Sequence, residues 1–169
     1  MVPIRPLLPA DASAYRELRL LALQESPTAF GSSYEQESVQ PPEFFAGRIA
    51  NTVDRLVLGA FGGDDLVGVV AFMRDSGVKT RHKGVIWGMY VHPDWRGKGI
   101  GRKLMLEILD RCEQMPDLRR VRLSVTGNNV AARKLYESLG FILYGVEVEA
   151  LRAAGEFLPE LHLVKTLVD

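Results

Sequence analysis

Three glycines at alternate positions mark the stretch YVHPDWRGKGIGRKLM, which runs from Tyr90 to Met105 between two apolar runs. Four cations accompany them, and the combined set is Arg96, Gly97, Lys98, Gly99, Gly101, Arg102 and Lys103. Glycine lets the backbone turn tightly and approach a ligand closely. A loop that enters a helix also presents unpaired N–H groups and the positive end of the helix dipole. The stretch predicts an anion site, typically for phosphate, with a simple turn and a solvated basic rim as the alternative.

The spacing excludes two common phosphate motifs. The glycines read G-x-G-x-G, whereas dinucleotide-binding folds use G-x-G-x-x-G after the first strand of a βαβ unit. A P-loop needs a glycine five residues before its Gly-Lys pair and a Ser or Thr directly after that pair. Here His92 takes the first position and Gly99 the second. The anion site must therefore belong to another kind of fold.

Periodicity places the glycine stretch between a strand and a helix. Alternating apolar residues predict strands in 2–8, on both sides of a hairpin turn at 62–65, in the run that ends at Pro93, and in 119–127, 141–151 and 158–167. Helical spacing predicts four helices, in 11–24, 40–51, 101–115 and 129–140. Pro27 and Gly31 predict an irregular segment at 25–37.

This order of elements predicts an α/β (α+β) fold with a mixed, mostly antiparallel sheet of about seven strands and four flanking helices. The strand, helix and strand around the glycine stretch should form a right-handed crossover, which makes those two strands parallel. Ile100, Leu104, Ile108 and Cys112 lie four residues apart and predict the buried stripe of the intervening helix. The length of 169 residues fits a single domain, residues 1–169.

The composition narrows the choice of partners. The chain has 21 basic and 21 acidic residues, so its net charge gives no reason to expect nucleic acid or an anionic membrane as a partner. No apolar run approaches the roughly 20 residues of a membrane helix. Cys112 is the single cysteine, so no internal disulfide can form and a cytoplasmic location is favoured. The three histidines are scattered and predict no metal site.

Two motifs together resemble the GNAT superfamily of N-acetyltransferases. Residues 96–101 fit the family signature R/Q-x-x-G-x-G/A. Residues 129–141 fit the pattern N-x-x-A-x-x-L-Y-x-x-x-G-F, through Asn129, Ala132, Leu135, Tyr136, Gly140 and Phe141. A predicted helix and strand separate the motifs, and the predicted element order resembles the family's over essentially the whole chain.

The resemblance implies that acetyl-CoA binds as a cosubstrate in a split between the fourth and fifth strands. A bulge in the fourth strand would expose backbone groups to the pantetheine arm, and N–H groups of the glycine stretch would hold the pyrophosphate. The implied cofactor contacts are Met89, Tyr90, Val91, Arg96, Gly97, Lys98, Gly99, Ile100, Gly101, Arg102, Asn129 and Tyr136.

The resemblance also implies that a primary amine attacks the thioester directly in a ternary complex. Tyr136 matches the family's general acid, which protonates the CoA sulfur, and the N–H of Val91 would polarise the carbonyl. The fourth strand, KGVIWGMYV, carries no carboxylate, so the Glu base that some family members place there does not carry over. The base stays open among Glu35, Glu37, Glu147, Glu149, His162 and a water relay.

The acceptor is expected to contact the segment 25–37, at Phe30, Ser32, Ser33, Tyr34 and Glu35. The family acts on protein N-termini, lysines and small amines, so the amine itself stays open. A homodimer is common in the family and is permitted by the apolar late strands. Two alternatives to an enzyme remain, namely a non-catalytic acyl-CoA sensor on the same fold and a module for another phosphate ligand. Tyr136 favours catalysis.

Overall fold

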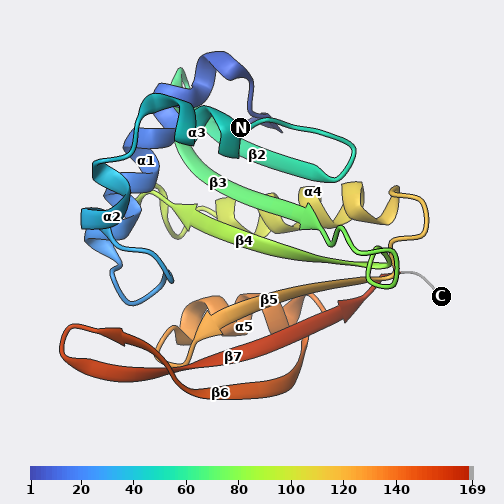
Figure 1. Ribbon diagram of the computed structural model, residues 1–169. Coiled ribbons are helices and arrows are strands. Elements are labelled where there is room, and N and C mark those ends of the chain that lie inside the picture. Colours follow the sequence, from blue (N-terminus) through green and yellow to red (C-terminus); the bar gives the residue numbers. More distant parts are fainter. Residues whose placement is uncertain (168–169) are drawn as a thin grey trace.

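The computed structural model describes residues 1–167, which form a seven-stranded sheet in the order β1-β2-β3-β4-β5-β7-β6 (Figure 1). The strands are β1 (Ile4–Pro6), β2 (Arg55–Gly62), β3 (Asp65–Arg74), β4 (Lys83–Val91), β5 (Arg120–Thr126), β6 (Ile142–Ala153) and β7 (Glu156–Thr166). The helices are α1 (Ala12–Glu25), α2 (Tyr34–Ser38), α3 (Pro42–Arg48), α4 (Ile100–Glu113) and α5 (Val130–Ser138), with short 3-10 helices η1 (Pro9–Asp11) and η2 (Pro93–Trp95).

All neighbouring strands of this sheet pair antiparallel except β4 and β5, which run parallel. The predicted fold class, a mixed and mostly antiparallel sheet of seven strands, is therefore confirmed. The hairpin predicted at 62–65 connects β2 to β3. The helix that follows the glycine stretch, α4, connects the parallel pair as predicted.

The parallel pair is short and then opens. Within residues 1–167, its register joins only Lys83–Val85 to Arg120–Arg122, although β4 continues to Val91. Figure 1 shows the two strands diverging toward the left of the view. A bulge accompanies the opening: Gly88 and Met89 of β4 oppose one residue of β3, and Gly88 has a φ of +64°. The predicted split between the fourth and fifth strands is thus present.

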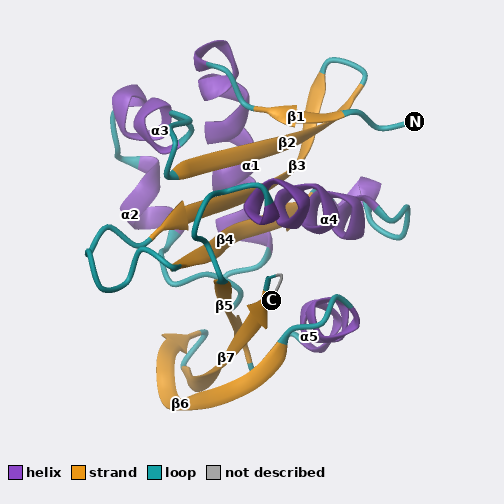
Figure 2. Ribbon diagram, turned by 90° about the vertical axis from the view of Figure 1, so that its right-hand side faces the viewer, coloured by secondary structure: helices purple, strands orange, loops and turns teal. Residues whose placement is uncertain are grey.

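Helices lie on both faces of the sheet (Figure 2), and each face has its own hydrophobic core. On one face lie α4 and α5, and the predicted stripe of Ile100, Leu104, Ile108 and Cys112 is at most 2% exposed there. On the other face, α1 and α3 pack around the fully buried Phe45. The burial confirms the stripe and shows Cys112 to be a core residue. Within the described residues, no helix is both long enough and apolar enough to cross a membrane.

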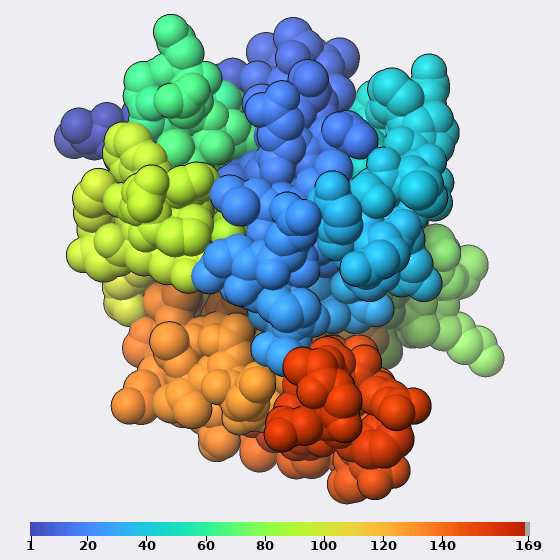
Figure 3. All heavy atoms as spheres, turned by 90° about the vertical axis from the view of Figure 1, so that its left-hand side faces the viewer, coloured from blue at the N-terminus to red at the C-terminus, as the bar shows by residue number. Residues whose placement is uncertain are grey.

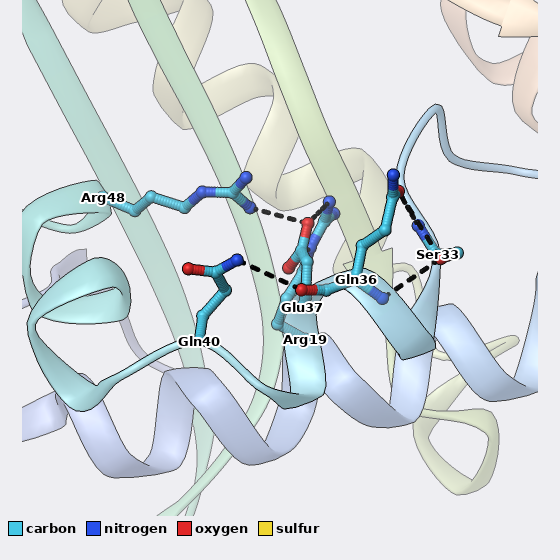
Figure 4. Close-up of polar contacts among 6 residues, drawn as sticks. All are labelled: Arg19, Ser33, Gln36, Glu37, Gln40 and Arg48. Carbon is cyan, nitrogen blue, oxygen red and sulfur yellow. Dashed lines mark hydrogen bonds and ion pairs between the residues drawn. The ribbon is translucent and has the colours of Figure 1, made fainter.

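The segment predicted to be irregular contains a fifth helix, α2, so the expectation of four helices was one too few. Ser33 begins the helix because its hydroxyl accepts a hydrogen bond from the Gln36 amide at 3.2 Å, while the Gln36 side chain accepts one from the Ser33 amide at 3.3 Å (Figure 4). This reciprocal pair is a capping box. Pro27 and Gly31 lie before α2 and interrupt the helical pattern only there. Their presence explains why the whole segment was predicted to be irregular.

Candidate active site

A cleft of about 600 Å³ occupies the opening between β4 and β5. Its walls come from β4, the glycine stretch, β5, α5 and the chain that follows α1. The predicted site residues that line it are Phe30, Met89, Tyr90, Val91, Arg96, Gly97, Gly99, Ile100, Gly101, Arg102, Asn129 and Tyr136. Trp87 and Ser124 line it too, and the sequence had not singled them out. The topology therefore gathers most of the predicted residues around one cavity.

The glycine stretch forms the loop that enters α4. Gly97 and Gly99 both have a φ of +74°, a conformation that side chains rarely adopt, and a Cβ on either would meet no atom within 4 Å. The amide of Lys103 bonds to the Gly99 carbonyl at 3.1 Å and is the first to close the helical pattern. The amides of the first turn before it are free of that pattern and carry the positive end of the dipole. The loop can therefore cradle an anion with backbone alone.

The backbone of Val91 faces the opening. The His92 amide donates to the Val67 carbonyl of β3, at 2.8 Å. In an antiparallel ladder, successive residues direct their N–H and C=O groups alternately toward and away from the neighbouring strand. The groups of Val91 therefore point away from β3, toward β5. Its carbonyl accepts a hydrogen bond from the Arg96 Nε at 3.0 Å, which leaves its N–H as the group available to a ligand.

Three of the four cations of the glycine stretch contact the protein itself. Arg96 forms a bidentate ion pair with Glu25 at the end of α1, with N–O distances of 2.7 and 3.0 Å. Lys98 Nζ donates to the Asp94 carbonyl at 3.0 Å, and Lys98 is not among the residues that line the cleft. Arg102 donates to the Ser138 hydroxyl at 2.9 Å. These side chains hold the loop in place, and the backbone faces the cleft.

Glu25 is a site residue that sequence reasoning missed. Its carboxylate accepts hydrogen bonds from Arg96, from the Ser26 hydroxyl at 2.6 Å and from the Tyr90 hydroxyl at 3.1 Å. The Arg96 hydrogen bonds above all lower the pKa of Glu25 to about 2. Burial, followed by the hydrogen bond to Glu25, raises the pKa of Tyr90 to about 12. The cluster ties the end of α1 to β4 and the glycine stretch.

Tyr136 lies in the wall of the cleft on α5. Its side chain is 7% exposed and packs edge-to-face against Phe141, with ring centroids 6.1 Å apart. Burial raises the pKa of the Tyr136 phenol to about 12, so the group is protonated at neutral pH. Among residues 1–167, no side chain accepts a hydrogen bond from its hydroxyl. A protonated phenol without a partner can donate to a ligand in the cleft.

Asn129 has a local role as well as a place in the wall. It precedes α5, and its side-chain oxygen accepts a hydrogen bond from the Ala132 amide at 3.3 Å. The side chain therefore acts as the N-cap of the helix that carries Tyr136. Any contact of Asn129 with a ligand must come from the groups that this cap leaves free.

The chain after α1 crosses the opening and closes one side of it. In Figure 3 this blue segment reaches the orange part of the chain that contains the end of β5. The Thr126 hydroxyl of β5 donates to the Thr28 carbonyl at 2.6 Å, which joins the two sides of the split. Phe30 packs against Tyr90 with ring centroids 6.2 Å apart, and the guanidinium of Arg19 lies 5.0 Å from the centroid of the Phe30 ring.

The other predicted acceptor residues lie outside the cleft wall. Ser32, Ser33, Tyr34 and Glu35 are not among the lining residues, and Ser33 is engaged as the cap of α2. Of the five predicted acceptor positions, the structure therefore brings only Phe30 to the cavity. Ser32 and Ser33 directly precede α2 instead, and Tyr34 and Glu35 form its first turn.

Glu37, a candidate for the base, is held in a buried ion cluster on α2. Arg19 donates two hydrogen bonds to its carboxylate, at 2.8 and 2.9 Å, and Arg48 donates a third at 3.1 Å (Figure 4). Burial is the largest influence and opposes ionisation, but the contacts with Arg19 and Arg48 and a weaker one with Ser32 together outweigh it and lower the pKa of Glu37. A carboxylate bound in this way is a poor proton acceptor. Its position supports Arg19 beneath Phe30, so its role is structural.

The comparisons with known proteins agree with the geometry. Residues 18–141 match the model of the acetyltransferase (GNAT) family. The N-alpha-acetyltransferase RimI of Mycobacterium tuberculosis is 33% identical over 115 residues, which cover 68% of this chain and 69% of RimI. A mycothiol acetyltransferase of Nocardiopsis dassonvillei is 42% identical over 65 residues, 38% of this chain, but the chain spans only 19% of that protein.

A solved structure extends the likeness to nearly the whole fold. The phosphinothricin acetyltransferase of Sinorhizobium meliloti, in complex with AcCoA, superposes with a TM-score of 0.85 at 19% identity, over 98% of this chain and 88% of that one. The family model spans most of the chain, and the RimI match spans two thirds of both proteins. The chain belongs to the GNAT acetyltransferase family.

Proposed function

We propose that the protein transfers the acetyl group of acetyl-CoA to a primary amine by direct attack in a ternary complex. The observation that carries the proposal is the cleft between the diverging parallel strands, with free amides at one end and a protonated Tyr136 in its wall. The open space at the Cβ positions of Gly97 and Gly99 fits a pyrophosphate held close to the backbone. Holding both reactants in one cleft would supply much of the rate.

We assign the roles of the groups from their positions. The N–H of Val91 would stabilise the charge that develops on the thioester oxygen. Tyr136 would donate its proton to the departing sulfur, so that the thiol leaves rather than the thiolate. The acceptor reaches the thioester from the side of the sheet that carries α1, where Phe30, Trp87 and Tyr90 form an aromatic wall.

Further proposals concern the domain, the location, the oligomeric state and the partners of the enzyme. The continuous sheet from Ile4 to Thr166 supports a single catalytic domain over residues 1–169. The free, buried thiol of Cys112 supports a cytoplasmic location. Exposed apolar side chains on the edge strand β6 support a homodimer. The zero net charge favours a small or peptide amine over a nucleic acid as partner.

The test incubates the protein with acetyl-CoA and a panel of amines: lysine, spermidine, free amino acids and peptides with different N-termini. Release of free thiol that depends on the amine is expected for at least one member of the panel. Thermal stabilisation by CoA without turnover on any amine would instead support the acyl-CoA sensor. The absence of stabilisation by CoA would overturn the proposal, because a ligand that binds only the native state must stabilise it.

A further inference from the structure

His162 lies beside the cleft on β7 and contacts a residue of its wall. Ser124 of β5 lines the cleft, and its hydroxyl lies 2.8 Å from the His162 Nδ1. The two residues are direct partners in the β5–β7 register, so the sheet itself fixes their proximity. The imidazole ring is therefore separated from the cavity only by the Ser124 hydroxyl.

The surroundings of His162 select which ring nitrogen carries the proton. Glu147 of β6 places a carboxylate oxygen 3.6 Å from Nε2. Glu160 is the other charged neighbour, and its carboxylate, that of Glu147 and the ring all lie within 4.8 Å of one another. Tyr144 completes the set, with its ring centroid 6.1 Å from the imidazole. A proton on Nε2 therefore faces negative charge, which leaves Nδ1 as an acceptor for the Ser124 hydroxyl.

We propose that Ser124 and His162 form the relay that removes the proton from the acceptor amine, with Glu147 orienting the ring. The inference rests on the proposed function and adds the base that the sequence left open. The Ser124 oxygen accepts a proton from the ammonium group while its own proton passes to Nδ1. The resulting imidazolium lies close to Glu147 and Glu160, whose charges stabilise it. The His162 side chain is 27% exposed, so the ring can return its proton to the solvent.

The protons of the reaction balance with this assignment. An ammonium group loses two protons when it becomes an amide. The first leaves through Ser124 and His162, after which the neutral nitrogen forms the C–N bond. The C–S bond then breaks, and the sulfur takes a proton from Tyr136. The second proton leaves the nitrogen for the solvent, and the solvent restores the Tyr136 proton. The relay also predicts a preference for cationic amines, since two carboxylates flank it.

The experiment measures kcat/KM for an alkylamine against pH at saturating acetyl-CoA, in the wild type and in His162→Gln and Ser124→Ala. The wild type can bind and deprotonate the ammonium form through the relay, so its kcat/KM should reach a plateau below the pKa of the amine. Each variant can use only the free amine, whose fraction rises tenfold per pH unit below a pKa of about 10.4. Its kcat/KM should be about 100-fold lower at pH 7 and approach that of the wild type at high pH.

His82→Gln is the matched control, because His82 lies before β4 at the paired end of the split. It should keep both the rate and the profile of the wild type. A wild-type profile in His162→Gln, even at a reduced rate, would overturn the relay, since a purely structural defect lowers the rate equally at every pH. Loss of the plateau in His162→Gln but not in Ser124→Ala would overturn the transfer through Ser124.

The two proposals fail in different ways. If the wild type released no thiol with any amine, the proposed function would be overturned together with the relay. If the wild type were active and the pH profile survived both substitutions, only the relay would be overturned. Thermal stabilisation by acetyl-CoA, measured for each variant, should match that of the wild type, because neither Ser124 nor His162 belongs to the loop proposed to hold the pyrophosphate.

Discussion

Tyr136 is the side chain whose protonation state matters most for the leaving group. Its phenol is buried, protonated at neutral pH and without a protein acceptor among residues 1–167. Tyr136→Phe removes the proton and keeps the ring that packs on Phe141. We expect kcat to fall about 100-fold while thermal stabilisation by acetyl-CoA is unchanged. Steady-state thiol release, with the amine saturating, measures the effect.

Tyr144→Phe is the matched control, because Tyr144 is an exposed tyrosine on β6. It should retain nearly full turnover, since its hydroxyl has no place in the transfer. Unchanged turnover in Tyr136→Phe would remove the phenol from the mechanism. A loss of acetyl-CoA binding along with turnover would point to a packing role for Tyr136.

The lowered pKa of Glu25 makes the stability of the folded protein depend on pH. Its pKa is about 2 in the folded chain against an ordinary value of 4.5, so the folded state binds fewer protons between these values. The stability that the Glu25–Arg96 pair contributes is therefore complete above pH 4.5 and is lost as the pH falls through 2. Glu25→Gln should melt at a lower temperature than the wild type at pH 7, and the difference should vanish near pH 2. Melting curves of both proteins from pH 7 to pH 2 measure it.

A constant difference in melting temperature at every pH would contradict this account, because a lost packing contact does not titrate. Glu17→Gln, on the same helix but outside the contact with Arg96, serves as the control. The Glu25–Arg96 pair is also a contact that no local sequence pattern predicts. Arg96 and Glu25 lie 71 positions apart, and only the tertiary fold brings them together. The sequence singled out Arg96 for its backbone N–H and gave no partner for its side chain.

Among the elements, the loop into α4 depends on backbone conformation more than on charge. Gly99 is the N-cap of α4 at a φ of +74°, where an L residue is strained by roughly 1 kcal/mol or more. Gly99→Ala should therefore destabilise the protein and weaken CoA binding, because the loop must shift its free amides. Calorimetric titration with CoA and urea unfolding measure the two effects.

Gly47→Ala is the corresponding control in α3. A Cβ at Gly47 meets no atom within 4 Å, and its φ is ordinary, so alanine should stabilise the helix by roughly 0.5–1 kcal/mol. CoA affinity should stay that of the wild type. If Gly99→Ala bound CoA as tightly as Gly47→Ala does, the backbone conformation at Gly99 would not be needed for the site.

The elements differ in how far the sequence could predict them. The stripe of α4 was readable because its four-residue spacing repeats over a whole helix. The five-residue α2 has no such repeat, and it is held by the Ser33 cap and by the Glu37 contacts with Arg19 and Arg48. A sharper reading of S-x-x-Q at 33–36 as a capping box could have found its start. The Arg contacts depend on tertiary structure and left no local signal.

At the scale of the whole molecule, element order and two motifs were enough to predict the family and the fold. The split was implied by the resemblance to the family, and the structure shows it where the short parallel pairing of β4 and β5 ends. The side of the cleft that faces the acceptor was predictable only in part. Phe30, expected in this region because it lies in a distinctive segment, lines the cavity, but Ser124 and His162 become neighbours only through the β5–β7 register. The spacing of residues along the sequence does not show which distant strands pair.

The edge strand β6 gives the last prediction. Several apolar side chains on it are largely exposed, among them Ile142 at 66%, Tyr144 at 58% and Val148 at 78%. An exposed apolar edge invites pairing with another chain. We therefore expect a homodimer with twice the 18.8 kDa mass of one chain. Light scattering coupled to gel filtration, over a range of protein concentrations, measures the mass.

Val148→Asp places a charge in this surface and should shift the protein to the monomer. Val78→Asp is the matched control, since Val78 is 94% exposed in the β3–β4 connection, outside β6. It should leave the dimer intact, which separates a specific interface from a general effect of charge on association. A wild type that stays at the monomer mass at high concentration would contradict the prediction. β6 also carries Glu147, which contacts His162. A dimer across this strand would therefore place the partner subunit beside the route by which the acceptor reaches the Ser124–His162 relay.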